Sequence, residues 1–381
     1  MNKKQIFLFI IAILCFWSGQ YIYVPTLTPY AKSIGSSVYM IGLIGGSYGL
    51  MQFLLRLPIG IISDITGKRK LNVISGMLCV LLSGICFLTS SAPIGILVAR
   101  MMAGVGASFW VVFTVMFHSK FRSSDKAIGM LSVCQMSGVT FSTLLGGWIS
   151  QNMGQKAPFV ATVVLGSLGL VLSLFLTEDK AEREPMKLKE LLETGKEKAV
   201  LFISLTGLIY QFVSFGSAYV FTPLVAKNLG MGDTQIGFLT FLFSLPGIFA
   251  GFLAGTSIFK KAGYVRSLGA AFVFMAVPLL FIVYTKSLTV LYFAQFVFGL
   301  GRGISYSILM LLVVKSVPES RKATAMGFFQ ATYALGMFAG PYLTGLISQN
   351  FSLVVSYLIM FFVCLAVAIS IFIFARKAQW K

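Results

Sequence analysis

The chain has 381 residues, of which 57% are hydrophobic and only 11% are charged. A soluble globular domain is roughly 25% charged and 45–50% apolar, so this composition excludes a water-soluble protein. The mean hydropathy is +0.90, and a spanning helix needs about 20 mostly apolar residues. The length therefore leaves room for about a dozen spans, which indicates an all-α polytopic membrane protein.

Apolar runs between charges and turn residues predict twelve spans, taken here in chain order. The first run opens at Lys3-Lys4 and continues to about Pro29 without a signal-peptide cleavage site, so we interpret it as a retained helix. The twelve ranges are 5–30, 37–63, 71–90, 94–117, 127–151, 157–177, 199–226, 235–258, 266–285, 288–314, 322–348 and 352–375. Glycine is spread through them, as suits close packing of membrane helices.

One long polar segment divides the chain. Residues 178–198 carry seven acids and six bases, and the pattern after Pro185 predicts a short surface helix over 186–192. We expect a six-helix bundle over 1–177, a cytoplasmic linker over 178–198 and a second six-helix bundle over 199–381.

The net charge of +19 is explained by the predicted membrane topology. With the N-terminus inside, 23 of the 30 Lys and Arg fall in cytoplasmic segments and three fall within spans. Only Lys32, Lys156, Lys227 and Lys286 fall outside. The positive-inside rule then puts both termini in the cytoplasm. We expect a multi-pass protein of a bacterial inner (plasma) membrane, a monomer in contact with membrane lipids, and no nucleic-acid partner.

The two halves repeat each other at an offset near 195. Ala31-Lys32-x-x-Gly35 recurs as Ala226-Lys227-x-x-Gly230, and Ile149-Ser-Gln-Asn152 recurs as Ile347-Ser-Gln-Asn350. Parallel repeats of six helices are a construction of secondary transporters, which place the substrate site at the midplane between the repeats.

Two motifs resemble those of the major facilitator superfamily, and the resemblance covers essentially the whole chain. Span four carries Arg100, Gly104 and Gly106, which is similar to the family's R-x-x-x-G-x-G motif. The loop between spans two and three resembles the family signature G-x-x-x-D-x-x-G-[RK]-[RK], through Gly60, Asp64, Gly67, Lys68, Arg69 and Lys70.

The resemblance implies two six-helix pseudo-repeats, a drug or metabolite exporter, and a role for each motif. The loop would be a cytoplasmic latch, with Asp64 at the positive end of span eleven; the alternative is a loop that only sets topology. Arg100 would couple or support span four. Span five departs from the drug-exporter pattern G-P-x-x-G-G, because it reads Ser142-Thr143-Leu-Leu-Gly146-Gly147.

The sequence gives little support to an enzyme. It has one His, no nucleotide-binding loop, and no paired carboxylates or metal cluster within a span, so we expect no catalytic residues, no metal and no cofactor. A mid-membrane Asp or Glu commonly relays protons in transporters. All eleven acids of this chain fall in loops or at span ends, so the spans contain no such residue. His118, at the inner end of span four, could titrate near neutral pH or serve as an interfacial residue.

The intramembrane charges are three arginines, and an Arg inside a span normally faces a wet cavity or a partner. Arg302 and Arg56 are candidates for binding an anion, because a guanidinium makes bidentate contacts with carboxylates and phosphates. The alternative is bonding to backbone carbonyls. The remaining candidates for substrate binding are polar or aromatic residues within spans, each of which could instead be a packing residue: Gln20, Tyr21, Gln52, Trp110, Gln135, Tyr210, Gln211, Tyr306, Gln330 and Tyr333.

Three functions remain open. The first is a rocker-switch exporter of a small drug-like compound or metabolite, with H⁺ as the coupling ion by family resemblance. The second is an organic-anion exchanger or facilitator that uses the arginines, since an anion leaving an inside-negative cell gains about 2.3 kcal/mol per 100 mV. The third is a membrane receptor that binds its ligand without moving it.

Overall fold

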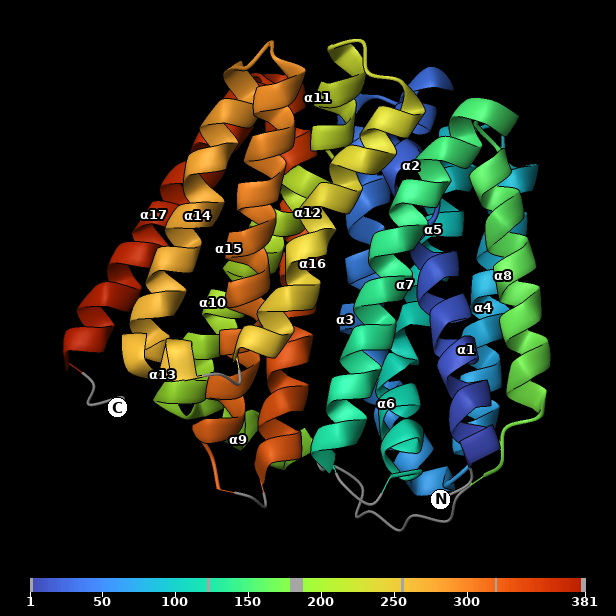
Figure 1. The fold of residues 1–381 in the computed structure, drawn as a ribbon, viewed down its shortest axis with the longest axis vertical. Helices are drawn as coiled ribbons and strands as arrows, with labels where there is room; N and C mark the ends of the chain where they lie inside the picture. Colours follow the sequence, from blue (N-terminus) through green and yellow to red (C-terminus); the bar gives the residue numbers. More distant parts are fainter. Residues whose placement is uncertain (1–2, 122–123, 179–187, 255–256, 319–320, 378–381) are drawn as a thin grey trace. The chain divides into compact units, whose positions relative to one another are not determined.

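The computed structural model describes residues 3–121, 124–178, 188–254, 257–318 and 321–377, and this part of the chain is helical without strands. The helices of the first half are α1 (Lys3–Tyr21), α2 (Val24–Ser33), α3 (Val38–Thr66), α4 (Arg69–Thr89), α5 (Pro93–Ser108), α6 (Trp110–His118), α7 (Ser124–Met153) and α8 (Ala157–Leu174). Those of the second half are α9 (Leu188–Lys196), α10 (Lys198–Ser214), the π-helix η1 (Phe215–Tyr219), α11 (Thr222–Asn228), α12 (Asp233–Ala254), α13 (Ser257–Ala262), α14 (Tyr264–Tyr284), α15 (Leu288–Lys315), α16 (Lys322–Asn350) and α17 (Leu353–Lys377). Figure 1 follows them along the chain.

These helices confirm the twelve predicted spans, with ends that differ by a few residues. Ten helical segments are long and apolar enough to cross a membrane. The other two predicted spans form α7 and α16, which are 30 and 29 residues long and richer in polar residues. The linker helix differs from its prediction: α9 continues to Lys196, while positions 186–187 lie outside the described residues.

Contacts divide the chain into two compact units. Unit 1 contains residues 1–36, 47–187 and 232–238, and unit 2 contains residues 37–46, 188–231 and 239–381. The first turns of α3 and α12 thus belong to a different unit from the rest of the same helix. The sequence predicts two bundles separated by the linker over 178–198. That these two bundles are independent domains stays a prediction.

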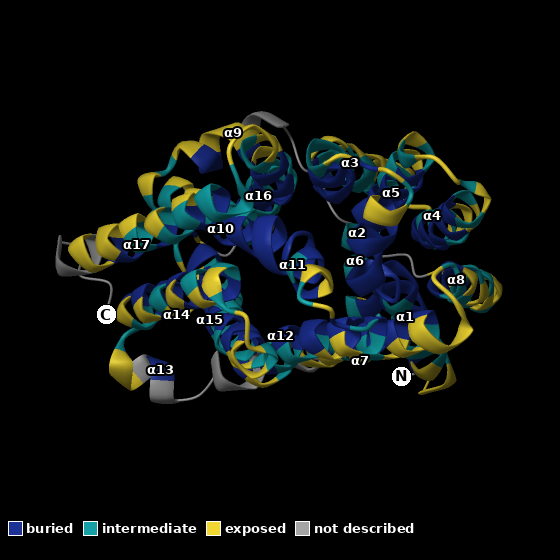
Figure 2. Cartoon of the chain, turned by 90° about the horizontal axis from the view of Figure 1, so that it is seen from above, coloured by how far each residue is buried: buried dark blue, intermediate teal, exposed yellow. Residues whose placement is uncertain are grey.

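The same packing scheme organises each unit. In unit 1, α1 packs on α7 and α8, and α4 packs on α5 and α8. In unit 2, α10 packs on α16, and α14 packs on α15 and α17. Figure 2 shows buried residues on the faces where helices of a unit meet and exposed residues on their outer faces. Many of those exposed residues are Leu, Val, Ile and Phe, as expected for helices whose outer faces meet hydrocarbon.

Glycines mark the repeat in the backbone. Gly35 and Gly230 have φ of +89° and +83°, and Gly67 and Gly263 have φ of +65° and +85°. These two pairs are separated by 195 and 196 residues, so equivalent turns use the same left-handed conformation, which glycine adopts without steric cost.

Glycines also allow two close helix crossings. A Cβ on Gly147 of α7 would lie 2.4 Å from the Asp233 carbonyl and 2.6 Å from Gly237 Cα, all within unit 1. In unit 2, a Cβ on Gly42 would lie 2.4 Å from the Pro341 carbonyl and 2.9 Å from Gly345 Cα. Residues 232–238 thus pack backbone to backbone in unit 1, and residues 37–46 do so in unit 2.

Candidate substrate site

The first span is interrupted at the same place in both halves. Span one breaks at Ile22-Tyr23 between α1 and α2, and Pro25 lies in the first turn of α2. Span seven changes to the π-helix η1 and restarts at α11, whose first turn contains Pro223. Interrupted helices at corresponding positions of two repeats are the best structural indicator of a transporter's binding site.

In unit 1, Arg100 binds the aromatic residues at this break. Its Nη1 donates a hydrogen bond of 2.7 Å to the Tyr23 hydroxyl. Its Cζ lies 4.2 Å from the centre of the Tyr48 ring and 5.5 Å from that of Tyr23. Arg100 is 3% exposed, and a desolvated cation–π contact stabilises by about 2 kcal/mol. Arg100 thus joins the break in span one to α3 and α5.

Tyr48, Gln52 and Arg56 follow one face of α3 at intervals of four residues. Gln52 Oε1 accepts a hydrogen bond from Arg56 Nη2, and Gln52 Nε2 donates one of 3.4 Å to the Tyr48 carbonyl. The Tyr21 ring meets the Tyr48 ring edge-on at 6.5 Å. We refer to Tyr21, Tyr23, Tyr48, Gln52, Arg56 and Arg100 as the first cluster.

Unit 2 contains a second cluster around Arg302, made of Tyr210, Tyr219, Phe243, Arg302 and Tyr306. Arg302 Cζ lies 5.0 Å from the centre of the Phe243 ring and 5.4 Å from that of Tyr219. These two rings meet perpendicularly at 4.9 Å. The Tyr210 and Tyr306 rings stack at 6.2 Å, and Tyr306 is one turn beyond Arg302 on α15. Arg302 is only half-buried.

The two clusters are related by the repeat. Phe243 is 195 residues after Tyr48, and Tyr219 is 196 residues after Tyr23. In each unit a glycine of the fourth span packs against the ring-bearing helix. A Cβ on Gly104 would lie 2.7 Å from the Tyr48 carbonyl, and one on Gly299 would lie 2.2 Å from the Phe243 carbonyl. Arg100 precedes its glycine by one turn, whereas Arg302 follows its glycine by about one turn.

Other predicted site residues lie apart from these clusters or at their margins. Gln20 Nε2 donates a hydrogen bond of 3.0 Å to the Ala103 carbonyl, which ties α1 to α5 near Gly106. Trp110 packs against Trp17 at 4.9 Å. Tyr333 meets Phe329 edge-on at 5.3 Å. Gln211 is buried, and Gln135 and Gln330 are half-buried. Their roles stay predictions.

Sequence reasoning did not single out Tyr23, Tyr48, Tyr219 or Phe243. Aromatic residues are common in apolar runs, so nothing marks these four as neighbours of a charge. One usable signal was the interval of four from Tyr48 to Gln52 to Arg56, which places all three on one helical face.

The predicted latch loop (residues 60–70) consists of the last turns of α3, a tight turn at Gly67-Lys68 and the start of α4, all in unit 1. Gly67, in the left-handed conformation, follows the end of α3 at Thr66, and α4 begins at Arg69. Asp64 is half-buried in the last turn of α3. Its role at span eleven, like the latch function, stays a prediction.

The carboxylate at the start of α4 is Glu178, which the sequence placed in the polar linker. The Arg69 N–H donates to Glu178 Oε1 at 2.7 Å, and the Lys70 N–H donates to both carboxylate oxygens at 3.1 Å. An anion at a helix N-terminus satisfies backbone donors that have no partner within the helix and complements the helix dipole.

The short segment that ends in Glu178 is fixed from two further sides. The Thr177 N–H donates to Gln5 Oε1 at 3.0 Å, and Gln5 Nε2 donates to the Phe175 carbonyl at 3.1 Å. Lys120 Nζ donates to the Thr177 carbonyl at 2.7 Å. The beginning of the linker is therefore bound to the latch loop, to α1 and to the segment after α6.

The two clusters combine aromatic rings with guanidinium groups. Among the residues that the structure describes, no three His, Cys, Asp or Glu side chains form a group that could hold a metal ion. Aromatic faces bind apolar bodies, and guanidinium groups bind anionic ones. A chain of paired six-helix repeats with such clusters beside interrupted helices has the construction of a secondary transporter.

Comparison with known proteins agrees with this class. The family model described as Major Facilitator Superfamily matches residues 9–224 and 203–379. The chain belongs to this superfamily and is a transporter, not an enzyme.

Relatives and structures are similar over most of their length. The chain is 24% identical to the "Uncharacterized MFS-type transporter MJ1560" of Methanocaldococcus jannaschii, over 92% of this chain and 93% of that one. It is 24% identical to the "Multi-drug resistance efflux pump PmrA" of Streptococcus pneumoniae, over 84% of this chain and 82% of that one. The crystal structure of the human organic anion transporter MFSD10 (TETRAN) matches with a TM-score of 0.72 and 16% identity, over 97% of this chain and 100% of that one, which shows a shared fold.

Proposed function

We propose that this transporter exports a small amphipathic organic compound by rocker-switch alternating access. The observation that carries the proposal is the occurrence, in each unit, of an arginine and aromatic rings beside an interrupted first span. Similarity to a multidrug efflux pump supports the direction of transport. The protein works as a monomer in a bacterial inner membrane, with both termini in the cytoplasm, as the positive-inside rule indicates.

The latch loop closes the cytoplasmic side in this scheme. Asp64, Lys68 and Arg69 belong to the turn that Glu178 fixes at the start of α4. Fixing this turn would keep its charged side chains in position to bind and release the end of span eleven during the transport cycle.

A transport assay on purified protein tests the export proposal. Proteoliposomes in which the cytoplasmic face is exposed would be given amphipathic compounds of positive, zero and negative charge. We expect saturable uptake of at least one class into the vesicles, and none by vesicles without protein. Saturable binding without uptake, in vesicles of either orientation, would contradict export and favour a receptor.

A second candidate function is the exchange or facilitated movement of an organic anion. It is favoured by the half-buried Arg302 in the second cluster, together with the location of all eleven acids outside the middle of the spans. In this case Arg302→Gln would lower affinity for the anion about 10- to 100-fold, because a hydrogen bond to a charged group contributes about 1.5–3 kcal/mol.

Ligand-induced stabilisation distinguishes the two candidates. A ligand at a hundred times its Kd stabilises the folded protein by about 2.7 kcal/mol, so the melting temperature would be recorded against the same compounds. Stabilisation by anions that disappears in Arg302→Gln or Arg56→Gln supports the anion carrier. Stabilisation by lipophilic cations that survives both changes supports the drug exporter.

The driving force of transport also distinguishes the drug exporter from the anion carrier. We propose H⁺ as the coupling ion of the drug exporter, so an imposed pH gradient alone should drive its transport. An anion carrier needs no proton and responds to voltage, at about 2.3 kcal/mol per charge per 100 mV. Transport that responds to a potassium-diffusion potential and ignores the pH gradient would exclude proton coupling.

A further inference from the structure

The repeated Ile-Ser-Gln-Asn motif has no part in the two aromatic–arginine clusters. Its first copy, residues 149–152, lies near the end of α7 in the first repeat, and its second copy, residues 347–350, ends α16 in the second repeat. The predicted topology puts both copies at the outer side of the membrane, opposite the latch loop. The motif is therefore a feature of the outer ends of spans five and eleven.

The glutamine of each copy binds the start of a helix in the other repeat. Gln151 Oε1 accepts a hydrogen bond of 3.1 Å from the Thr234 N–H, at the second residue of α12. Gln349 Oε1 accepts one of 2.9 Å from the Tyr39 N–H, at the second residue of α3. An N–H in the first turn of a helix has no partner within that helix. Each glutamine thus caps a helix of the opposite repeat.

Each cap lies one turn beyond a glycine crossing of the same two helices. In the first crossing, a Cβ on Gly237 of α12 would lie 2.8 Å from the Cα of Gly147. In the second, a Cβ on Gly345 of α16 would lie 2.9 Å from the Cα of Gly42. Small residues let two backbones approach closely without interlocking side chains. The helices of each pair can therefore separate at these crossings without a rearrangement of side chains.

The serine of the motif distinguishes the two copies. Ser150 donates a hydrogen bond of 2.6 Å to the Asp233 carboxylate of α12, and a hydrogen bond to an ionised acceptor is about twice as strong as a neutral one. Asp233 is 6% exposed, so water competes little for this bond. Ser348 pairs instead with Ser356 of α17, at 2.8 Å, within its own repeat. The contact of α7 with α12 thus has a polar bond at the serine that the contact of α16 with α3 does not have there.

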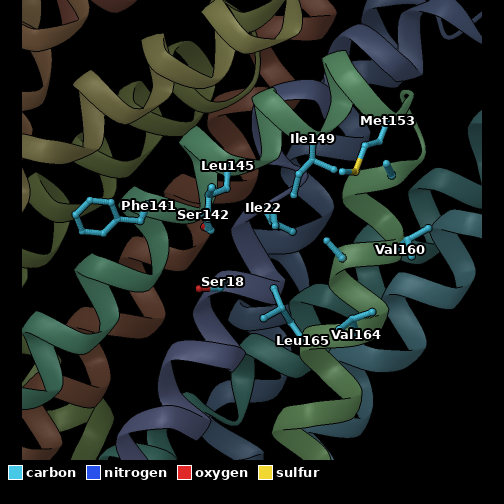
Figure 3. Close-up of a pocket in the computed structure, with 12 residues that line it drawn as sticks. Ser18, Ile22, Phe141, Ser142, Leu145, Ile149, Met153, Val160, Val164 and Leu165 are labelled. Atoms are coloured by element: carbon cyan, nitrogen blue, oxygen red, sulfur yellow. The ribbon is translucent and has the colours of Figure 1, made fainter.

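Two other positions of the motif contact their own repeat. Ile149 lines the apolar pocket between α7 and α8 (Figure 3). Asn152 and Asn350 each donate a hydrogen bond to a carbonyl one turn earlier in the same helix, at 2.8 and 2.9 Å. Each asparagine is therefore a matched reference for the glutamine beside it.

We propose that the two Ile-Ser-Gln-Asn motifs form an outer gate, which is closed while Gln151 and Gln349 cap helices of the opposite repeat and opens when both caps break. This inference rests on the proposed function. Alternating access moves one repeat against the other, so it separates α7 from α12 and α16 from α3. Both caps are formed in this structure, so the gate is closed here. The bond from Ser150 to Asp233 makes the α7–α12 side the stronger of the two.

Spin labels on two outer loops test the gate without a transported compound. Ser91→Cys and Lys286→Cys label exposed positions, 195 residues apart, in the loops after α4 and α14. Pulsed electron paramagnetic resonance measures the distance between the labels in the purified full-length protein. The five native cysteines are buried or half-buried, and the protein without added cysteines gives their background.

We expect the loss of one cap to increase the population with the outer side open. Gln151→Ala or Gln349→Ala should raise the population of a longer distance about fivefold, the factor expected for one hydrogen bond. Both side chains are exposed, so these variants keep the fold. An unchanged distance distribution in both variants would overturn the proposal. Failure of every compound in the transport assay would contradict export and would leave this measurement unaffected.

Matched variants assign the effect to particular positions of the motif. Asn152→Ala and Asn350→Ala should leave the distances unchanged. Ser150→Ala should increase the longer distance at least as much as Gln151→Ala does, because its bond goes to a charged group, whereas Ser348→Ala should have no effect. Equal effects of the glutamine and asparagine variants would refute the caps as the gate, and equal effects of the two serine variants would refute the stronger α7–α12 side.

Discussion

The two aromatic–arginine clusters use equivalent rings but arrange their arginines differently. Arg100 is buried and hydrogen-bonded to Tyr23, so its guanidinium is part of the packing of unit 1. Arg302 contacts the equivalent rings from a position about one turn after the repeated glycine, whereas Arg100 lies one turn before it. Arg302 is also only half-buried. The two arginines lie two turns apart along the repeat and contact equivalent rings, but with different burial. Only a ligand-binding role for Arg302, the less buried of the two, is part of our proposal.

The largest effect we predict is on stability, through exchange of each arginine for glutamine. Arg100→Gln should lower the free energy of unfolding by about 3 kcal/mol, because it removes a hydrogen bond to a charged group and a desolvated cation–π contact. Arg302→Gln should cost less, about 0.5–1 kcal/mol, because it removes cation–π contacts of a guanidinium that is only half-buried. Thermal unfolding of both purified variants measures this, and equal destabilisation would remove the distinction between the clusters.

The Tyr23 hydroxyl provides a finer comparison. Tyr23→Phe keeps the ring face but leaves a buried donor of Arg100 without its acceptor, at a cost of about 1–3 kcal/mol. The melting temperature of this variant should fall, and Arg100→Gln added to it should cost less than in the wild-type protein. Additive losses in that double-mutant cycle would show that the two groups do not act together.

The close helix crossings, like the aromatic rings, occur in both units, and their contribution to stability can be tested. Gly147→Ala would place a Cβ 2.4 Å from the Asp233 carbonyl, and such overpacking costs about 1–3 kcal/mol. Gly129→Ala in the same helix is the matched control, since nothing lies within 4 Å of the added Cβ. The melting temperature should fall for the first variant and stay or rise for the second.

The smallest predicted effect concerns Glu178, which binds the start of α4. Glu178→Gln keeps an acceptor but removes the charge at the helix N-terminus, so we expect a loss of about 0.3–1 kcal/mol that diminishes at high salt. Glu193→Gln, in the exposed linker helix α9, is the control. A salt-independent loss would indicate that the charge of Glu178 contributes nothing.

The sequence predicted the architecture more fully than the site. Apolar runs, loop charges and the 195-residue offset determine spans and repeat, because a bilayer forces helices of a fixed minimum length. They do not reveal the break at Tyr23, since an apolar run looks the same whether or not its backbone is continuous. Arg56, Arg100 and Arg302 were singled out because charge within a span is costly, but the aromatic rings beside Arg100 and Arg302 are chemically ordinary residues of such runs.

Glu178 shows a related limit of sequence reasoning. It belongs to a stretch of alternating charges, and nothing local distinguishes it from its neighbours. Its importance comes from the end of α8 lying beside the start of α4, a tertiary relation between segments more than a hundred residues apart.

The shared helices have a consequence for how the protein is made. Unit 1 includes residues 232–238, so its packing cannot be complete when α8 leaves the ribosome. One further span and the first turns of the next must be synthesised first, which takes several seconds at about 5–20 residues per second. During that interval Gly147 has no partner backbone, and the nascent half depends on the insertion machinery or on lipid to cover the surface that α12 will occupy.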